Sequence, residues 1–280
     1  MSAKILNGKT TAAEAKALCR EYLNKKGIMP GLVIITIGDD PASAVYVRNK
    51  IKACEECGIY VRHEKFAADA DLDIVRGTIF NANLSTSVAG IMIQLPVPDG
   101  WDDRELMELI DPEKDVDGLT YTNIGMLWSS EAMHYPCTAK GIDWLLHENG
   151  IHFTGKHVVI VGRSDIVGKP MAAIALENNA TVTICHSKTK NLAEMTRQAD
   201  ILIVAVGKAG LITADMVKPG AVVVDVGINR NEEGKLVGDV DFDSVAEVAG
   251  WITPVPGGVG PMTVAMLMNN VARALAFMED

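Results

Sequence analysis

The chain has 280 residues and a mass of 30.0 kDa, which is enough for about two domains. Hydrophobic residues make up 48% and charged residues 22%, an ordinary globular composition that excludes a disordered chain. The net charge of −10 argues against a general nucleic-acid or membrane-surface protein, since both need a basic face. An anionic ligand would therefore need locally placed cations.

The chain begins with MSAKILNGKT, which lacks the apolar segment of a signal peptide. The longest uncharged run, residues 248–272, is interrupted by prolines and glycines and is not expected to cross a membrane. Five cysteines are scattered along the sequence, and one Cys-x-x-Cys pair, Cys54 and Cys57, is at best half a zinc site. We expect a soluble protein of the reducing cytoplasm that holds no metal.

The first half of the chain alternates helical and strand patterns. Apolar residues at positions 15, 18, 19 and 22 have helical spacing, and the apolar run at 31–38 is typical of a strand buried in a parallel sheet. A helix is predicted from about Pro41 to Cys57, before Gly58. Further elements are predicted in the order strand, helix and strand, at residues 59–65, 72–83 and 88–95. This alternation indicates an α/β domain with a parallel sheet.

The pattern restarts after residue 154. Strands are predicted at 157–161, 181–185, 201–206 and 222–226, with helices at 168–178 and 191–198. This series is typical of a Rossmann-like, doubly wound nucleotide-binding domain. A final helical pattern follows a Pro/Gly loop and is expected to return to the first domain. We therefore predict a catalytic domain of residues 1–136 plus 264–280 and a nucleotide-binding domain of residues 137–263.

A turn that could bind a phosphate follows the strand at 157–161 and reads GRSDIVGKP over residues 162–170. Its glycines let the backbone approach a phosphate, whose charge the next helix N-terminus stabilises. Pro170 suits the first turn of that helix. The loop is neither a Walker A loop, which has a different spacing, nor a standard Gly-x-Gly-x-x-Gly, because Ser164 replaces the second glycine. Taken alone, it is equally consistent with a plain structural turn.

The end of the next strand indicates which dinucleotide would bind. An NAD site usually has a carboxylate there for the ribose 2′-hydroxyl, but the sequence reads CHSK at 185–188. Ser187 and Lys188, with Arg163 in the facing turn, are groups suited to a 2′-phosphate. NADP is therefore favoured over NAD. The alternative is that Lys188 is a solvent-exposed loop residue.

The helix that starts at Pro41 carries a possible chemical site. Ser43, Tyr46 and Lys50 share one face, so a hydroxyl, a phenol and an ammonium project together. Burial of Lys50 would fit it for proton transfer, whereas the alternative is an amphipathic helix with an exposed lysine. The Tyr-x-x-x-Lys spacing occurs in short-chain dehydrogenases as well, but there the pair follows the nucleotide turn and here it precedes it.

Two further segments belong with this helix. Gln94 ends a predicted strand and would lie at the carboxyl edge of the sheet, where α/β proteins bind ligands. The segment KDVDG at 114–118 does not fit an EF-hand, because Glu113 and Ile124 occupy loop positions 1 and 12. Its simplest interpretation is a turn with two capping aspartates.

Seven segments together carry a family resemblance: SAVYVRNK (43–50), QLPVP (94–98), KDVDG (114–118), GRSDIVGKP (162–170), CHSKT (185–189), DVGIN (225–229) and PVPGGVGPMT (254–263). In this order, and over nearly the whole chain, they resemble the bifunctional methylenetetrahydrofolate dehydrogenase/methenyltetrahydrofolate cyclohydrolases, the FolD family. The resemblance implies that Lys50 is catalytic, that Gln94 tunes its protonation and that Asp117 grips the pterin. Tyr46 is then the aromatic that stacks on the folate, and Ser43 supports it.

The resemblance also implies the remaining contacts. Substrate contacts would include Leu95, Pro256, Gly257, Gly258 and Gly260, and NADP contacts would include Gly162, Arg163, Ser164, Ser187, Ile228 and Thr263. One departure is Ala139, which follows Pro-Cys-Thr where the family usually has a second proline. The loss of that proline frees a backbone dihedral but removes no catalytic group.

The implied chemistry has two steps. A hydride passes from 5,10-methylenetetrahydrofolate to NADP⁺, and water then opens the methenyl product to 10-formyltetrahydrofolate. Lys50 with Gln94 is the polar pair suited to the proton transfers of the second step. The resemblance further implies a homodimer formed through the nucleotide domains. One alternative is a monofunctional dehydrogenase, although Lys50, Gln94 and Asp117 speak against it. The other is a nucleotide-binding protein without turnover, which would have no use for the face of Ser43, Tyr46 and Lys50 beside an intact cofactor turn.

Overall fold

The computed structural model describes residues 2–278, apart from the side chain of residue 42, and consists of two compact α/β units. One unit comprises Ala13–Cys137 together with the chain from Val264 onward. The other comprises the chain up to Ala12 together with Thr138–Thr263. The fold class expected from the sequence is confirmed, and no described helix is long and apolar enough to span a membrane.

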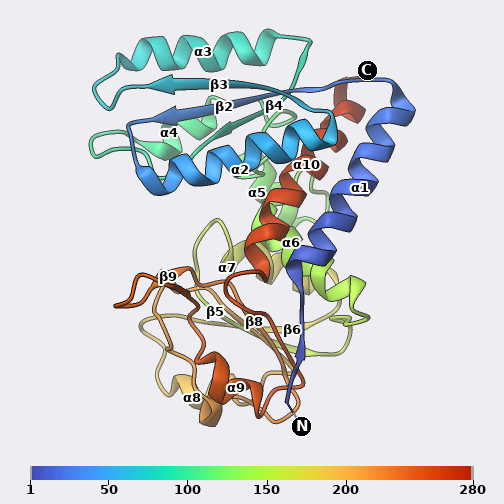
Figure 1. Cartoon of the computed structure of the whole chain (residues 1–280), viewed down its shortest axis with the longest axis vertical. Coiled ribbons are helices and arrows are strands. Elements are labelled where there is room, and N and C mark those ends of the chain that lie inside the picture. The colour runs from blue at the N-terminus through green and yellow to red at the C-terminus, as the bar shows by residue number, and fades with distance from the viewer. Residues whose placement is uncertain (1, 279–280) are drawn as a thin grey trace. The chain divides into compact units, whose positions relative to one another are not determined.

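The unit of Ala13–Cys137 is built on a parallel sheet whose described strands have the order β3-β2-β4. Figure 1 shows α2 and α3 on opposite faces of this sheet. From β2 the chain moves in one direction to β3, and from β3 it moves in the opposite direction to β4, so two right-handed crossovers place their helices on opposite faces. The strands are β2 (Gly31–Ile37), β3 (Tyr60–Phe66) and β4 (Val88–Ile93), and the helices are α2 (Pro41–Cys57), α3 (Leu72–Leu84), α4 (Asp103–Glu108) and α5 (Tyr121–Trp128).

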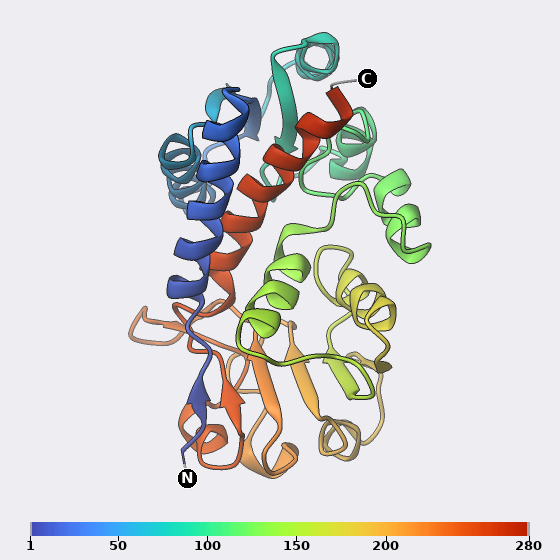
Figure 2. The same cartoon turned by 90° about the vertical axis from the view of Figure 1, so that its right-hand side faces the viewer.

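Two long helices, α1 (Gly8–Lys26) and α10 (Val259–Met278), contribute most of their length to this unit. Figure 2 shows them side by side, and there the Cys19 thiol donates a hydrogen bond to the Met268 carbonyl at 3.4 Å. Asn270 of α10 donates to the carbonyls of Val116 and Tyr135, both at 2.8 Å. The C-terminal helix thus holds two loops of this unit, one of which leads directly to Asp117.

Helix α2 begins and ends where the sequence predicts. The Asp40 side chain accepts a hydrogen bond from the Ser43 backbone N–H at 2.7 Å, and Pro41 occupies the first turn, where its missing N–H leaves no bond unmade. Gly58 ends the helix with φ of 81°, a left-handed conformation that favours glycine. These two caps fix the helical register that sets Ser43, Tyr46 and Lys50 on one face.

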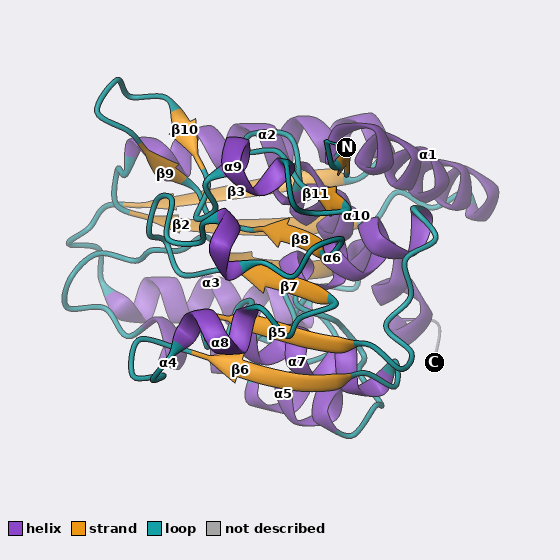
Figure 3. Ribbon diagram, turned by 90° about the horizontal axis from the view of Figure 1, so that it is seen from below, coloured by secondary structure: helices purple, strands orange, loops and turns teal. Residues whose placement is uncertain are grey.

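The second unit is a doubly wound α/β fold. Its described strands form a parallel sheet in the order β1-β11-β8-β7-β5-β6, and Figure 3 shows β6, β5, β7 and β8 side by side. The strands are β1 (Lys4–Ile5), β5 (His157–Val161), β6 (Thr181–Cys185), β7 (Ile201–Val204), β8 (Val222–Asp225) and β11 (Trp251–Ile252). The helices are α6 (Cys137–Glu148), α7 (Gly168–Glu177), α8 (Leu192–Thr196), α9 (Phe242–Ala246) and the 3₁₀ turn η1 (Ala214–Met216).

The order of this sheet defines where a ligand can bind. From β5 the chain moves outward to β6 and then returns to the other side of β5 as β7, so the strand order reverses between β5 and β7. In open parallel sheets, the crevice at such a switch point, outside the carboxyl ends of the strands, is the usual ligand site. The turn at residues 162–170 lies there. A separate antiparallel pair, β9 (Asn229–Arg230) and β10 (Leu236–Val237), follows β8.

The start of the chain departs from the expected domain boundary. Strand β1 pairs in parallel with β11, and the Leu6 backbone N–H donates to the Ile252 carbonyl at 2.8 Å. The residues up to Ala12 therefore belong with the nucleotide sheet and not with the expected domain of residues 1–136. A strand of two residues has no periodicity that a sequence pattern could reveal. Ala139, the departure from the family proline, is buried in the first turn of α6.

Candidate active site

Lys50 and Gln94 form a hydrogen-bonded pair at the carboxyl edge of the β3-β2-β4 sheet. The Lys50 Nζ donates to Gln94 Oε1 at 3.0 Å and lies 3.7 Å from the Met92 sulfur. The Gln94 Nε2 donates to the Leu95 carbonyl at 2.7 Å, which fixes the amide with its oxygen toward the lysine. The Gln94 backbone N–H pairs with the Ile35 carbonyl at 2.8 Å, so the glutamine follows the register of the sheet. The amide oxygen and the amide nitrogen of Gln94 are both held in place by these hydrogen bonds.

Ser43 and Tyr46 complete the same face of α2. The Ser43 hydroxyl donates to the Leu95 carbonyl at 3.4 Å, the same oxygen that receives the Gln94 amide. Tyr46, one turn before Lys50, keeps 39% of its surface exposed. Its ring is thus available to stack on a planar ligand, and the Ser43–Leu95 hydrogen bond joins the start of α2 to the segment after β4.

Asp117 is the second charged group of this site, after Lys50. It is half-buried, and burial raises its pKa above the ordinary value, whereas the positive charge of Lys50 and the thiol of Cys137 act in the opposite direction. The same burial raises the pKa of Cys137 and keeps that thiol protonated. Lys50 and Asp117 therefore lie within electrostatic reach of one another, and the carboxylate can accept N–H donors from a ligand.

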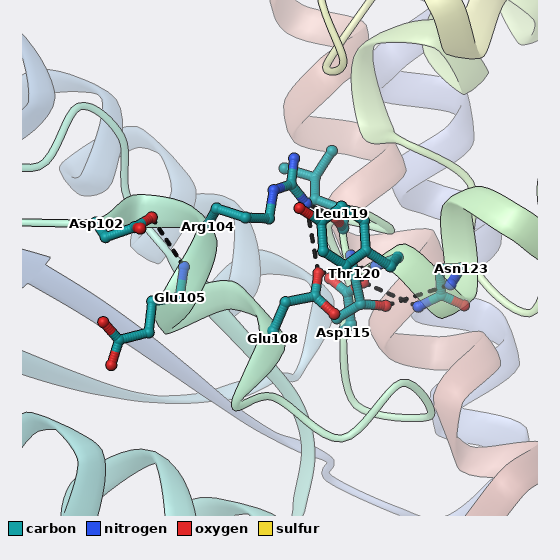
Figure 4. Close-up of polar contacts among 9 residues, drawn as sticks. Asp102, Arg104, Glu105, Glu108, Asp115, Leu119, Thr120 and Asn123 are labelled. Carbon is teal, nitrogen blue, oxygen red and sulfur yellow. Dashed lines mark hydrogen bonds and ion pairs between the residues drawn. The ribbon is translucent and has the colours of Figure 1, made fainter.

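The two aspartates of KDVDG have different tasks. Asp115 is buried, and its Oδ2 accepts hydrogen bonds from the Thr120 backbone N–H at 2.7 Å and from Asn123 Nδ2 at 2.9 Å (Figure 4). The loop adds to β4, because the Ile91 N–H donates to the Lys114 carbonyl at 2.7 Å. Asp115 thus builds the loop, as the predicted capping role suggests, and leaves Asp117 for a ligand.

Lys114 also has a structural task. Its Nζ donates to the carbonyls of Asn83 at 2.6 Å and Ser85 at 2.8 Å, where α3 ends. Those carbonyls have no partner within the helix, and a lysine there satisfies them and complements the helix dipole. The lysine next to Asp115 is therefore not a substrate group.

A second set of contacts, drawn in Figure 4, supports the segment that follows. Arg104 of α4 donates to the Leu119 carbonyl at 2.6 Å and pairs with Glu108 at 3.5 Å. Glu108 in turn accepts a hydrogen bond from the Tyr121 backbone N–H at 2.8 Å. The hydrogen bond from Tyr121 to Glu108 connects α4 to the start of α5, and the Arg104 contact with Leu119 holds the chain between Asp117 and α5.

In the other unit, glycines make the turn at residues 162–170 compact. Gly162 has φ of 135°, and a Cβ on it would lie 2.3 Å from the Ala205 carbonyl oxygen. A Cβ on Gly168 would lie 2.3 Å from the Gly162 carbonyl oxygen. The Ser164 hydroxyl accepts a hydrogen bond from the Val167 N–H at 3.2 Å. The backbone can therefore come close to a phosphate at the N-terminus of α7, and Ser164 shapes the turn itself.

The groups expected to bind a 2′-phosphate occupy neighbouring segments. The Gly162 N–H donates to the Cys185 carbonyl at 2.9 Å, which joins the turn before Arg163 to the end of β6. Arg163, Ser187 and Lys188 are all exposed, and no acid stands at this strand end. The observed donors fit an anionic group better than a ribose hydroxyl.

The Pro/Gly loop has an unexpected neighbour. A Cβ on Gly8, the first residue of α1, would lie only 1.7 Å from the Gly258 carbonyl oxygen. Gly257 has φ of 108°, and Lys9 packs against it. The chain start therefore supports the segment that contains Pro256, Gly257, Gly258 and Gly260. Sequence patterns could not reveal this contact, because its partners lie at opposite ends of the chain.

The last two predicted cofactor contacts lie in the same unit. Ile228 is 49% exposed in the loop after β8, and the Thr263 hydroxyl lies 3.1 Å from that of Thr138. Among the described residues, no group of three His, Cys, Asp or Glu side chains could hold a metal ion.

Family models match both units. The catalytic-domain model of tetrahydrofolate dehydrogenase/cyclohydrolase matches residues 6–117, and the NAD(P)-binding-domain model of the same family matches residues 136–278. The chain belongs to the tetrahydrofolate dehydrogenase/cyclohydrolase family. It is 54% identical over 277 residues to the bifunctional protein FolD of Nitrosospira multiformis, which covers 98% of this chain and 96% of that protein.

Solved structures agree with this family. The bifunctional enzyme FolD of Campylobacter jejuni superimposes with a TM-score of 0.96 at 46% identity, over 99% of each chain. The FolD of Trypanosoma brucei, complexed with NADP cofactor and inhibitor, superimposes with a TM-score of 0.94 at 35% identity, over 99% of this chain and 98% of that one.

In this tetrahydrofolate dehydrogenase/cyclohydrolase, the predicted substrate residues divide between the two units: the Lys50 group lies in one, and Pro256, Gly257, Gly258 and Gly260 lie in the other with the predicted NADP residues. Hydrogen bonds join Ser43, Lys50, Gln94 and Leu95, and the charge of Lys50 reaches Asp117. Among the predicted cofactor residues, Gly162, Arg163 and Ser164 follow β5, Ser187 follows β6 and Ile228 follows β8, whereas Thr263 lies in α10. The capping role predicted for KDVDG applies to Asp115. The structural role of Lys114, in the same segment, was not predicted, and Asn123, Asn270 and Gly8 carried no recognisable sequence signal.

The close packing of the nucleotide turn gives a direct test. Gly168→Ala places a methyl group against the Gly162 carbonyl, so the turn must shift; we expect NADP⁺ affinity to fall about tenfold or more. Gly77→Ala in α3 is the matched control, since a Cβ there meets nothing within 4 Å and should leave binding unchanged. Isothermal titration calorimetry measures both. Equal affinities for the two variants would contradict the packing argument.

Proposed function

We propose that this chain oxidises 5,10-methylenetetrahydrofolate to 5,10-methenyltetrahydrofolate with NADP⁺ and then hydrolyses the product to 10-formyltetrahydrofolate. The observation that carries the proposal is the 3.0 Å hydrogen bond between Lys50 and Gln94 in reach of Asp117, in a chain that also contains a dinucleotide turn. A protein that bound only nucleotide would have no use for the Lys50 group. Family membership and the FolD relatives support both activities.

The substrate is held by groups suited to a folate. Asp117 accepts hydrogen bonds from the amino-pyrimidine of the pterin, and Tyr46 stacks on its ring system. Ser43 and Leu95 shape the adjacent surface. The residues Pro256, Gly257, Gly258 and Gly260 form a side-chain-poor loop that can approach a flat ligand closely.

The residues of the nucleotide unit fit NADP. The backbone at Gly162 and the N-terminus of α7 would hold the pyrophosphate, with Ser164 shaping the turn. Arg163, Ser187 and Lys188 would hold the 2′-phosphate, and Ile228 and Thr263 would contact other parts of the cofactor. When bound, NADP⁺ supplies the acceptor for the hydride that leaves the methylene carbon. In this step the protein aligns the donor carbon and excludes competing water.

The hydrolytic step depends on proton transfer. Water adds to the methenyl carbon and loses one proton, which leaves a neutral carbinol. The carbinol O–H then loses its proton to form the formyl C=O as the bond from that carbon to N5 breaks, and N5 gains a proton, so that one proton is released overall. Lys50 is the group placed to move these protons, and the oriented Gln94 amide holds its Nζ in position. No metal ion takes part in this scheme.

We further infer a cytoplasmic homodimer that binds neither nucleic acid nor membranes. All five cysteines are free and buried, as suits a reducing compartment. In the nucleotide unit, β6 lies at the edge of the sheet and leaves Ile184 37% exposed, which provides a surface for a second copy. The net charge of −10 disfavours polyanionic partners.

The role of Lys50 is tested by Lys50→Met, which keeps the apolar stem and removes the ammonium. We expect cyclohydrolase activity to fall about 100-fold or more, because proton transfer is lost, while NADP⁺ binding changes less than about twofold. Lys52→Met is the control, since that side chain is exposed two residues further along the helix. Hydrolysis of methenyltetrahydrofolate is the measurement, and an unchanged rate would remove Lys50 from the mechanism.

The 2′-phosphate assignment is tested by Arg163→Ala. Loss of a charge-assisted contact should raise the KM for NADP⁺ about tenfold or more and leave the KM for NAD⁺ almost unchanged. Arg197→Ala serves as the matched control, because its guanidinium is occupied by the Asp215 carbonyl at 3.2 Å. Equal losses for the two cofactors would contradict the assignment.

A further inference from the structure

Two buried carboxylates lie beneath the loops that follow β7 and β8. Asp239 is fully buried and Asp225 is 3% exposed, and neither has a role in the chemistry described above. Both belong to the nucleotide unit. Asp225 ends β8, and Asp239 follows the β9-β10 hairpin. A charged pair that is removed from water in this way must have hydrogen-bond partners.

Asp239 is enclosed by backbone N–H groups. Its Oδ2 accepts hydrogen bonds from the N–H groups of Val206 at 2.7 Å and Gly207 at 3.0 Å. Its Oδ1 accepts hydrogen bonds from the Lys208 N–H at 2.8 Å and from Asn229 Nδ2 at 2.8 Å. Consecutive N–H groups that converge in this way form an anion-binding nest. The nest is occupied by the protein's own carboxylate, which fixes the path of the loop after β7.

Asp225 holds the neighbouring loop. Its Oδ1 accepts hydrogen bonds from the N–H groups of Gly227 and Asp239, both at 2.9 Å, and its Oδ2 from that of Val240 at 3.0 Å. Burial raises the pKa of Asp225 to about 6, although its backbone donors oppose the shift. The group is thus ionised at neutral pH. Gly238 permits this approach, since a Cβ on it would lie 1.8 Å from Asp225 Oδ2.

The two carboxylates secure the loop of Ile228 on both sides. Gly227, before it, is bound to Asp225, and Asn229, after it, is bound to Asp239. The loop after β7 begins at Ala205, whose carbonyl oxygen packs against Gly162 of the nucleotide turn. Both secured loops therefore leave the carboxyl ends of strands: β7 borders the switch point of the sheet, the usual ligand site, and β8 is the next strand along.

We propose that Asp239, with Asp225, is a positioning residue for the dinucleotide: it sets the shape of the loops at residues 205–208 and 227–229 against which the cofactor lies. This inference rests on the proposed function. Asp225 and Asp239 then affect how tightly NADP⁺ binds and how it is aligned, and they take no part in hydrolysis. Asparagine cannot replace Asp239, because its amide has one acceptor oxygen and its NH₂ group would face N–H donors. Those donors would lose their acceptor unless the loops moved.

The test is Asp239→Asn in the full chain. We expect the Kd for NADP⁺, measured by calorimetry, and the KM for NADP⁺ to rise about tenfold or more. Cyclohydrolase activity on methenyltetrahydrofolate without added nucleotide should stay within about twofold. Asp241→Asn is the matched control, because that exposed carboxylate bonds only locally, to the Ser244 hydroxyl at 2.7 Å, and should bind NADP⁺ like the parent chain.

An unchanged Kd for Asp239→Asn would overturn the inference. An equal loss of NADP⁺ binding and cyclohydrolase activity would also overturn it, since the role would then be general folding. If circular dichroism shows that Asp239→Asn is unfolded, the variant Asn229→Ala is tested in its place. It keeps both carboxylates and removes only the hydrogen bond from Asn229 to Asp239, next to Ile228. A Kd raised at least about threefold then supports the inference, and an unchanged Kd overturns it. If the proposed function itself were wrong, the parent chain would already show no dehydrogenase or cyclohydrolase activity.

Discussion

Parallel strand pairing is the constraint on which both sites depend. In each sheet a ladder hydrogen bond continues one residue beyond a strand end: Gln94 N–H to the Ile35 carbonyl, and Ala205 N–H to the Val161 carbonyl, both at 2.8 Å. Because parallel strands end at the same edge, the residues placed by these bonds come together although they are distant in sequence. Gln94 is set beside Lys50 in one unit, and Ala205 beside Gly162 in the other.

Burial separates carboxylates that build loops from one that is open to a ligand. Asp115, Asp225 and Asp239 are nearly or fully buried, and each accepts hydrogen bonds from backbone N–H groups. Asp117 is only half-buried and lies in reach of a lysine. The cations divide in the same way, since Lys114 satisfies carbonyls at the end of α3, whereas Arg163 is exposed. A net charge of −10 is therefore compatible with anionic ligands, because the few cations that serve them are local.

Local patterns in the sequence predicted the parts of the fold and site that are themselves local. The spacing of Ser43, Tyr46 and Lys50 on a capped helix, and the turn after β5, could be recognised because each depends on residues a few positions apart. The contacts that support the two sites could not be recognised in this way. Asp239 meets its nest 31 to 33 residues earlier in the chain, and Asn270 contacts a carbonyl 154 residues away. Such pairs are fixed by tertiary packing, for which a single sequence has no periodic signal.

The most direct measurement follows reduced cofactor and folate products together, after purified protein is mixed with 5,10-methylenetetrahydrofolate and either NADP⁺ or NAD⁺. We expect NADPH and 10-formyltetrahydrofolate to appear in equal amounts, methenyltetrahydrofolate to be only transient, and NAD⁺ to react more slowly. If methenyltetrahydrofolate accumulated and was hydrolysed no faster than in the absence of protein, the chain would lack the second activity. Absence of NADPH would contradict the account as a whole.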